Sequence, residues 1–182
     1  MSLTTQVNYD AKEKIWRGSK MKPKFDPNSN VGWLILNELK KTPDMVTQVS
    51  ADTGVEVTCE MMRRRTITIA RHLHESGYKQ HDVVGFVASN CEHLAPVVFA
   101  CFTLGLPINP LAPVMTESDL IHIYSKTKPK IIFCDAPVIS LVQNAVNKMK
   151  LNSKICTFMD KVDGYEFVDD ILSAATEEDE FK

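Results

Sequence analysis

The sequence predicts an α/β domain with a doubly wound, mostly parallel sheet and helices on both faces. From residue 82 onward, short apolar runs typical of buried parallel strands alternate with amphipathic helical segments. Because crossovers between parallel strands are right-handed, a β–α–β–α–β order covers both faces of the sheet with helices. The chain has 182 residues, 44% of them hydrophobic and 24% charged, which suits one globular domain or at most two.

The first predicted helix covers residues 31–41. Its apolar residues recur at helical spacing, and Pro43 stands just after its expected end. The side chains expected on its buried face are Val31, Leu34, Ile35 and Leu39. Two extended segments follow, at residues 45–50 and 55–57, joined by an Asp-Thr-Gly turn at residues 52–54.

A second helix is predicted to begin after Thr58. The hydroxyl of Thr58 can accept a hydrogen bond from the first turn, where the helix dipole also favours the negative charge of Glu60. Apolar or small side chains at helical spacing form one buried stripe, which consists of Met62, Thr66, Ile69, Ala70 and Leu73. Gly77 ends this helix.

Strands and helices then alternate. The predicted strands are residues 82–88, 106–109, 130–134 and 154–159, and the predicted helices are residues 92–104, 116–126 and 137–150. Pro107, Pro110 and Pro113 make the connection after the second of these strands stiff and extended. Thr116 and Asp119 predict a capping box in which Asp replaces the usual Glu.

Charge is spread unevenly along the chain. Residues 1–30 carry six Lys and Arg against three acidic residues, and residues 160–182 carry two against nine. The formal net charge of -2 argues against an electrostatic nucleic-acid binder, and we expect no nucleic-acid partner. We expect residues 1–30 to be a loosely ordered basic lead-in rather than a membrane or nucleic-acid arm. Residues 31–172 form the expected α/β subdomain, and residues 173–182 an acidic tail.

The cysteines and the apolar segments predict a compartment. Five cysteines, at positions 59, 91, 101, 134 and 156, form no Cys-x-x-Cys pair, which favours reduced core cysteines over a disulfide framework or a zinc site. No signal peptide is visible, and the longest apolar stretch, residues 94–108, is interrupted by proline and glycine. We therefore expect an intracellular, cytoplasmic chain without a membrane span.

Few residues suggest catalysis. His72 and His74 are two apart on a helix and point apart, so they cannot share a metal. Asp119 and His122 could form half of a metal site or an acid–base pair, although a surface hydrogen bond explains them more simply. The arginines at residues 63–65 could hold a phosphate or could cover a solvated helix face. No phosphate-binding loop or nucleophile elbow is present, so we name no catalytic and no metal-binding residue.

One place suggests a ligand. The strand at residues 82–88 ends in Ser89 and Asn90, and ligands of open parallel sheets gather beyond the carboxyl ends of the strands. Asn109 is expected at a comparable level after the next strand. The alternative is that Ser89 and Asn90 cap the following helix, since both residue types are preferred at that position.

Residues 66–113 resemble the N-terminal region of the adenylate-forming acyl-CoA ligases (AMP-dependent synthetase/ligase family, insect luciferase-like and 4-coumarate-CoA-ligase-like group). The landmarks are the helix ending at Gly77, the strand closing on Ser89 and Asn90, and the run LGLPINP at residues 104–110. The resemblance extends from about residue 31 to residue 172. The chain departs from it at residues 58–62, where Thr-Cys-Glu-Met-Met replaces the family's Thr-Tyr-x-Glu-Leu. That motif is structural in the family, so the departure does not by itself imply lost activity.

The resemblance implies a ligase that joins a carboxylic acid, by expectation a fatty acid, to CoA through an acyl-adenylate. ATP, Mg and CoA are then the cofactors of a full-length parent, which could be peroxisomal. In the family, the catalytic parts come later than the sequence equivalent to residue 182. They are the phosphate loop ending Pro-Lys-Gly, the adenine and ribose contacts, the hinge and the catalytic Lys. We therefore expect an N-terminal fragment or short isoform that holds no cofactor and is inactive alone.

The remaining expectations concern partners and alternatives. The expected partner is the rest of the ligase or a full-length paralogue. The alternative is a stand-alone, non-catalytic α/β binding or regulatory module, for which a free strand edge and apolar face would be the reason. An unrelated receiver domain lacks a candidate acidic pair here, and a flavin domain lacks its Ser/Thr/Gly-rich loop.

Overall fold

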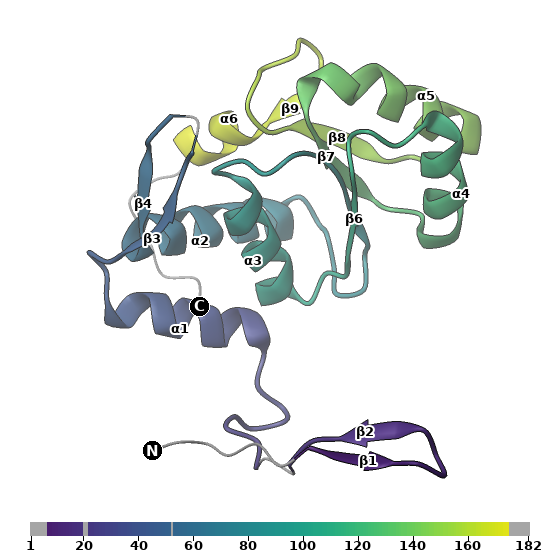
Figure 1. The fold of residues 1–182 in the computed structure, drawn as a ribbon. Coiled ribbons are helices and arrows are strands. Elements are labelled where there is room, and N and C mark those ends of the chain that lie inside the picture. The colour runs from purple at the N-terminus through teal and green to yellow at the C-terminus, as the bar shows by residue number, and fades with distance from the viewer. Residues whose placement is uncertain (1–6, 20–21, 52, 175–182) are drawn as a thin grey trace.

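A single five-stranded parallel sheet organises the larger part of the molecule (Figure 1). The computed structural model describes residues 7–19, 22–51 and 53–174. The sheet has the order β6-β5-β7-β8-β9, and every neighbouring pair in it is parallel. Its strands are β5 (Val84–Val87), β6 (Ile108–Leu111), β7 (Ile131–Cys134), β8 (Lys154–Thr157) and β9 (Glu166–Phe167).

Helices cover both faces of this sheet, which confirms the predicted doubly wound α/β fold. One face packs against α2 (Cys59–Glu75), α3 (Leu94–Leu104) and α6 (Val168–Ser173), and the other against α4 (Glu117–Thr127) and α5 (Ile139–Met149), which follows the short 3-10 turn Ala136–Val138. Alternation along each strand divides the side chains between the two cores. In β7, for example, Phe133 belongs to the first core and Ile132 to the second.

Three phenylalanines mark the centre of the first core. The ring centroid of Phe133 lies 5.8 Å from that of Phe86 and 5.6 Å from that of Phe158. All three side chains are buried. Aromatic groups of this size dominate the energetics of a core, so this cluster anchors the sheet to the helices above it.

The remaining elements precede the sheet in sequence. They are the hairpin β1 (Asn8–Asp10) and β2 (Ile15–Arg17), the helix α1 (Val31–Lys41), and the hairpin β3 (Val46–Val49) and β4 (Glu56–Thr58). The helix α1 lies against α3, where Asn30 Nδ2 donates to the carbonyl of Thr103 at 3.3 Å. Figure 1 shows the first hairpin standing apart from the sheet and its helices.

The helix boundaries and caps agree well with the sequence. The helix at residues 31–41, the cap at Thr58 and the capping box of Thr116 and Asp119 are confirmed. All five side chains predicted for the buried stripe of α2 are buried. On α1, however, the predicted face is partly wrong, because Val31 is 51% exposed while Gly32 and Leu36 are buried. The close contact of Gly32 with α3 rotates the helix toward that side.

Three parts of the chain differ from expectation. The strand β6 runs through Pro110 and ends at Leu111, which an edge strand permits because its outward-facing N–H groups need no partner. Periodicity gave no sign of β9 and α6. A short hairpin occupies part of the segment for which a loosely ordered lead-in was expected. Asp52, in the predicted turn, and residues 175–182, most of the predicted acidic tail, lie outside the described residues.

The cysteines and the helices bear on the remaining expectations. All five cysteines are free, and four of them are buried, as expected for core cysteines, whereas Cys91 is partly exposed. Within the described ranges, no helix has the length and apolar character needed to cross a membrane.

Candidate functional site

The carboxyl edge of the sheet brings Ser89 to the neighbouring strand. Because β5 and β7 are parallel, Val87 lies opposite Cys134, and the residues that follow both strands emerge together. The backbone N–H of Ser89 donates to Oδ2 of Asp135 at 2.8 Å. Neither Ser89 nor Asn90 caps the next helix, so the capping alternative is wrong. α3 starts only at Leu94, its capping position is held by His93, and that cap has no side-chain hydrogen bond.

Asn109 does not join this edge. It is the second residue of β6, lies opposite Gly85 in the middle of β5, and its Nδ2 donates to Oγ1 of Thr127 at 2.8 Å. The predicted strand ended two residues too early, at the point where the prolines begin. The structure therefore brings Ser89 and Asn90 to the sheet edge and places Asn109 within the sheet.

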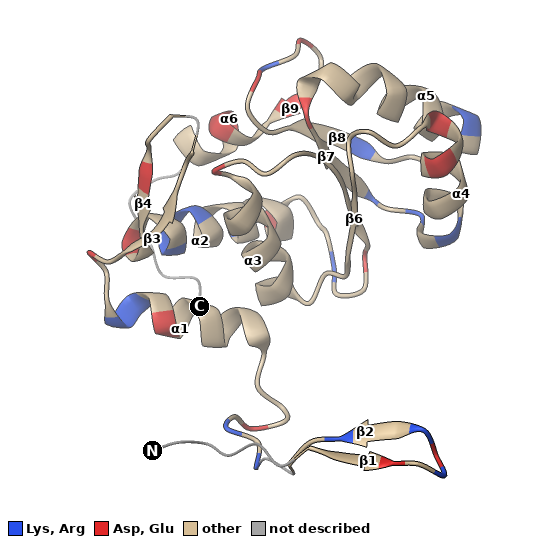
Figure 2. Ribbon diagram, in the orientation of Figure 1, with Lys and Arg blue, Asp and Glu red and all other residues tan. Residues whose placement is uncertain are grey.

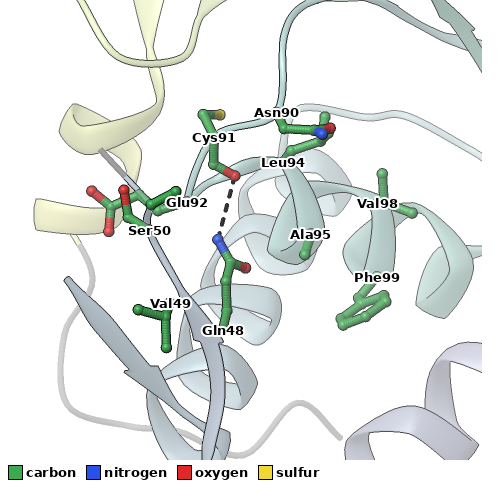
Figure 3. Close-up of a pocket in the computed structure, with 11 residues that line it drawn as sticks. Gln48, Val49, Ser50, Asn90, Cys91, Glu92, Leu94, Ala95, Val98 and Phe99 are labelled. Carbon is green, nitrogen blue, oxygen red and sulfur yellow. Dashed lines mark hydrogen bonds between the residues drawn. The ribbon is translucent and has the colours of Figure 1, made fainter. Parts of the chain in front are cut away.

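A pocket of about 550 Å³ opens beside Asn90, between β3 and α3 (Figure 3). Its lining consists of Gln48, Val49, Ser50, Ala51, Asn90, Cys91, Glu92, Leu94, Ala95, Val98 and Phe99. One wall is the end of the β3 strand, the other is the apolar face of α3, and the loop after β5 closes one end. α3 carries no charged residue, as Figure 2 shows, so this wall is apolar throughout.

The polar groups of the pocket are few and partly engaged. Gln48 Nε2 donates to the carbonyl of Cys91 at 3.5 Å, which joins β3 to the loop after β5. The carboxylate of Glu92 pairs with Arg65 of α2 at 3.1 Å, and both side chains are 20% exposed. Burial raises the pKa of the Cys91 thiol, so this cysteine is not an activated nucleophile.

The three arginines of α2 form ion pairs rather than a purely solvated face. Arg63 and Arg64 both reach Glu60 at 2.9 Å, and Arg65 reaches Glu92. The hydrogen bond from Arg63, partly opposed by burial and assisted by Arg64, lowers the pKa of Glu60 to about 2. The pair with Glu92 holds Arg65 at the rim of the pocket, where the carboxylate of Glu92 balances its charge.

A buried histidine lies behind this rim. His93 is 3% exposed, its Nε2 lies 3.0 Å from Oδ1 of Asp169 in α6, and its Nδ1 is buried without a hydrogen-bond partner among the described residues. Burial lowers the pKa of His93, although the nearby carboxylates of Asp169 and Glu92 oppose this effect. The contact ties the loop after β5 to the last helix.

The pocket does not fit a nucleotide triphosphate or its magnesium ion. None of its lining residues is cationic, and its one carboxylate would repel phosphate. No group of three or more potential metal ligands occurs in the part of the chain that the structure describes. Asp119 is engaged in its capping box, and the ring of His122 lies 3.2 Å from Lys126 Nζ. Among the described contacts these two residues therefore form neither the expected surface hydrogen bond nor an acid–base pair.

Several residues of the site were not foreseen from the sequence. Gln48, Phe99 and the pair of His93 with Asp169 come from segments that are far apart in the chain. The alternating pattern of residues 45–50 correctly predicted a strand, but it carried no information about which helix that strand would face. Gln48 shares the strand with another polar residue, Thr47, so residue type alone does not mark it as part of a pocket.

Comparisons with known proteins give the family. The sequence model of the family described as AMP-binding enzyme matches residues 36–180. The luciferin 4-monooxygenase of Photuris pensylvanica is 25% identical over 130 residues, which cover 70% of this chain and 24% of that protein. The probable acyl-activating enzyme 21 of Arabidopsis thaliana is 27% identical over 93 residues, which cover 51% of this chain and 17% of that protein.

A solved structure shows the same fold over nearly the whole chain. The luciferase-like enzyme from the nonluminescent Zophobas morio mealworm superposes with a TM-score of 0.84 at 23% sequence identity, over 91% of this chain and 39% of that chain. The chain thus spans less than half the length of each of these relatives. The family match covers well over half of the sequence, and the chain therefore belongs to the family of AMP-binding enzymes, with the N-terminal fold of the adenylate-forming ligases.

Proposed function

We propose that this chain is the N-terminal part, or a short isoform, of an ATP-dependent ligase that joins a carboxylic acid to CoA through an acyl-adenylate. The observation that carries the proposal is the family match over residues 36–180. The resemblance to the luciferase-like and acyl-CoA ligase group makes a fatty acid the proposed acid. We also propose residues 31–172 as the α/β subdomain, preceded by the lead-in of residues 1–30 and followed by the tail of residues 173–182.

The 182-residue chain is, in this proposal, inactive as a ligase on its own. Adenylate formation requires groups that stabilise the charge developing on the phosphates, usually with a metal ion. The pocket offers amides, a hydroxyl and a carboxylate that is already paired with Arg65. ATP, Mg and CoA would therefore be held by the rest of a longer polypeptide, and in that protein the present residues would support the site from outside.

The assay that tests this proposal is acid-dependent exchange of pyrophosphate into ATP. We expect the purified 182-residue chain to give no exchange above a buffer blank with medium- or long-chain fatty acids. The product of the longest reading frame containing this sequence should give exchange that depends on the added acid. A parallel reaction without acid is the control. Exchange by the 182-residue chain itself would refute the claim that it is inactive alone.

A stand-alone, non-catalytic α/β module is the second candidate. It is favoured by the cover on both faces of the sheet, which gives residues 62–173, most of α2 included, a core of their own. In that case the recombinant chain is monodisperse and unfolds in one cooperative transition. Aggregation and rapid proteolysis of the whole chain would contradict this candidate and favour a fragment.

Location is the last part of the proposal. We propose a cytoplasmic location for the 182-residue chain and a peroxisomal one for a longer parent. Fluorescent fusions of the two products, with the tag at the N-terminus so that any C-terminal address stays free, test this directly. Colocalisation of the short product with a peroxisomal marker would contradict the assignment.

A further inference from the structure

Exposed apolar side chains are concentrated in one part of the molecule. All but two of the large apolar side chains that are exposed in the described chain lie within residues 7–61. The two exceptions, Val114 and Met159, are isolated from each other in sequence. Single exposed apolar residues need no explanation, but a patch of them marks a surface that binds a protein, a membrane or a ligand, or one that is prone to aggregation.

The hairpin of β1 and β2 presents the most exposed aromatic group. Tyr9 and Trp16 are cross-strand partners whose ring centroids lie 4.8 Å apart, and they are 50% and 69% exposed. Because side chains alternate along a strand, Val7 points to the same face, whereas Asp10 and Arg17 form an ion pair on the opposite face at 3.8 Å. Ile15, the strand partner of Asp10 and 47% exposed, also lies on that opposite face, so the hairpin has an uncovered aromatic pair on one face and a further exposed apolar side chain on the other.

An isolated two-stranded hairpin is marginally stable in water, because it buries too little apolar surface. Figure 1 shows this one set apart from the helix α1 and the sheet. Tyrosine and tryptophan are also the residue types that contribute most to binding at protein interfaces. The Tyr9–Trp16 pair thus has the composition and the exposure of an interface contact.

A second apolar surface lies on the other hairpin. Val46, Val49 and Val55, on β3 and the turn leading to β4, are between 39% and 59% exposed. Met45 and Met61 stand at the two ends of this segment and are also exposed. Val57 is completely buried and attaches the hairpin to the body of the molecule. One face of this hairpin is thus anchored while several of its other side chains remain open.

We infer that these two hairpin surfaces pack against the remainder of a ligase-length polypeptide. This inference rests on the proposed function. The argument for this occupant is length: 91% of this chain superposes on the mealworm enzyme, yet it accounts for 39% of that chain. The larger share of such a protein therefore lies outside the part that matches this chain. A second copy and a lipid surface are the competing occupants.

Hydroxyl-radical footprinting read by mass spectrometry tests the inference. The two samples are the 182-residue chain and the product of the longest reading frame containing it. We expect the oxidation rates of Trp16 and Tyr9 to fall about fivefold or more in the longer product, because interface aromatics become excluded from water. Met159, 44% exposed, is the internal reference against which Met45, 56% exposed, is compared.

A pair of variants makes the test independent of footprinting. In the longer product, Trp16→Ala should increase the unfolded fraction about tenfold or more, whereas in the 182-residue chain the change should stay within about twofold. Val114→Ala is the matched control, since Val114 is 89% exposed and lies outside the two surfaces. It should change both proteins by less than about twofold.

Several outcomes would overturn the inference. The first is unchanged reactivity of Trp16 in the longer product, and the second is a reading frame that stops at Lys182. The third is protection of Trp16 when the short chain dimerises. The fourth is protection of Trp16 in the short chain by vesicles of phosphatidylcholine and phosphatidylserine. Activity separates this inference from the proposed function. A longer product that protects Trp16 but gives no pyrophosphate exchange refutes the proposed activity alone, and an active product with reactive Trp16 refutes this inference alone.

Discussion

The sheet region and the segment before it differ in how fully their apolar side chains are buried. In residues 62–173, which include most of α2, both faces of the sheet are covered, and the strands β5 and β7 are buried at every residue. In residues 7–61, valines, methionines and aromatics remain exposed, most of them on or next to the two hairpins. The sheet region therefore has a core that can stabilise it alone, whereas the preceding segment keeps the apolar surface that we infer packs against the remainder of a longer polypeptide.

The largest expected loss of stability comes from a substitution at the centre of the sheet region. Phe133→Ala should lower the free energy of unfolding by about 3–5 kcal/mol, because it empties the space between Phe86 and Phe158. Phe25→Ala is the matched control: Phe25 is 55% exposed and precedes α1, so its loss should cost less than about 0.5 kcal/mol. Urea unfolding followed by circular dichroism measures both. Equal costs for the two variants would contradict the comparison.

The second effect concerns the junction of the two regions. A Cβ added to Gly32 would collide with the backbone nitrogen and Cα of Thr103, so Gly32→Ala forces α1 away from α3. We expect a loss of about 1–3 kcal/mol from this overpacking. Asn37→Ala, on the exposed side of the same helix, should be neutral or slightly stabilising because alanine favours helices. Thermal unfolding of the two variants checks this, and a harmless Gly32→Ala would show that the junction is loose.

The third effect is a pH dependence that arises in the sheet region. Burial lowers the folded pKa of His93 below its usual 6.5, so the unfolded state takes up the proton more readily. Stability from this group is present at higher pH and is lost as pH falls from about 7.5 to about 5.5. The groups facing His93 are Asp169, Glu92 and Arg65.

Urea midpoints measured across this pH range for the parent chain and for His93→Gln test this dependence. The variant should have a flatter profile, whereas a matched change at an exposed histidine, His81→Gln, should leave the slope unchanged. A steeper profile in His93→Gln would mean that the contact with Asp169 outweighs burial and would reverse the sign.

The smallest effect compares two valines in strands. Val49→Thr should change stability by less than about 0.5 kcal/mol, because Val49 is 59% exposed and threonine is also favoured in strands. Val87→Thr should cost about 1–3 kcal/mol, since it places a hydroxyl at a completely buried position of β5. Chemical unfolding measures the difference. A cost above about 1 kcal/mol for Val49→Thr would show that this hairpin surface is already covered in the isolated chain.

Prediction from the sequence succeeded where the signal is local. The stripe of α2, the cap at Thr58 and the capping box at Thr116 depend on residues within a few positions of one another, and each was found. The predicted strand at β6 ended too early because Pro110 is a residue type that usually ends a strand. The strand β9 was not predicted because its two residues are too few to show an alternating pattern. The face of α1 was misassigned because it depends on a contact between Gly32 and Thr103, which are far apart in the chain.

The candidate site was predicted less well than the fold. Ser89 and Asn90 were correctly placed after a buried strand, since parallel strands end together at one edge. The helix start at Leu94, the second residue of β6 at Asn109 and the wall formed by Gln48 follow from three-dimensional packing. They could not be read from the linear order of residues.

The α/β class and most element boundaries follow from the sequence alone, because they depend on periodicity and caps within short segments, and the family follows from the resemblance of its motifs to known ligases. Only the tertiary structure decided which side chains meet, among them the pair of His93 and Asp169 and the pocket between β3 and α3. It also decided which apolar residues stay uncovered. The physical reason is that burial depends on neighbours brought together by folding, and the same alternating pattern describes a covered strand and an open one until those neighbours are known.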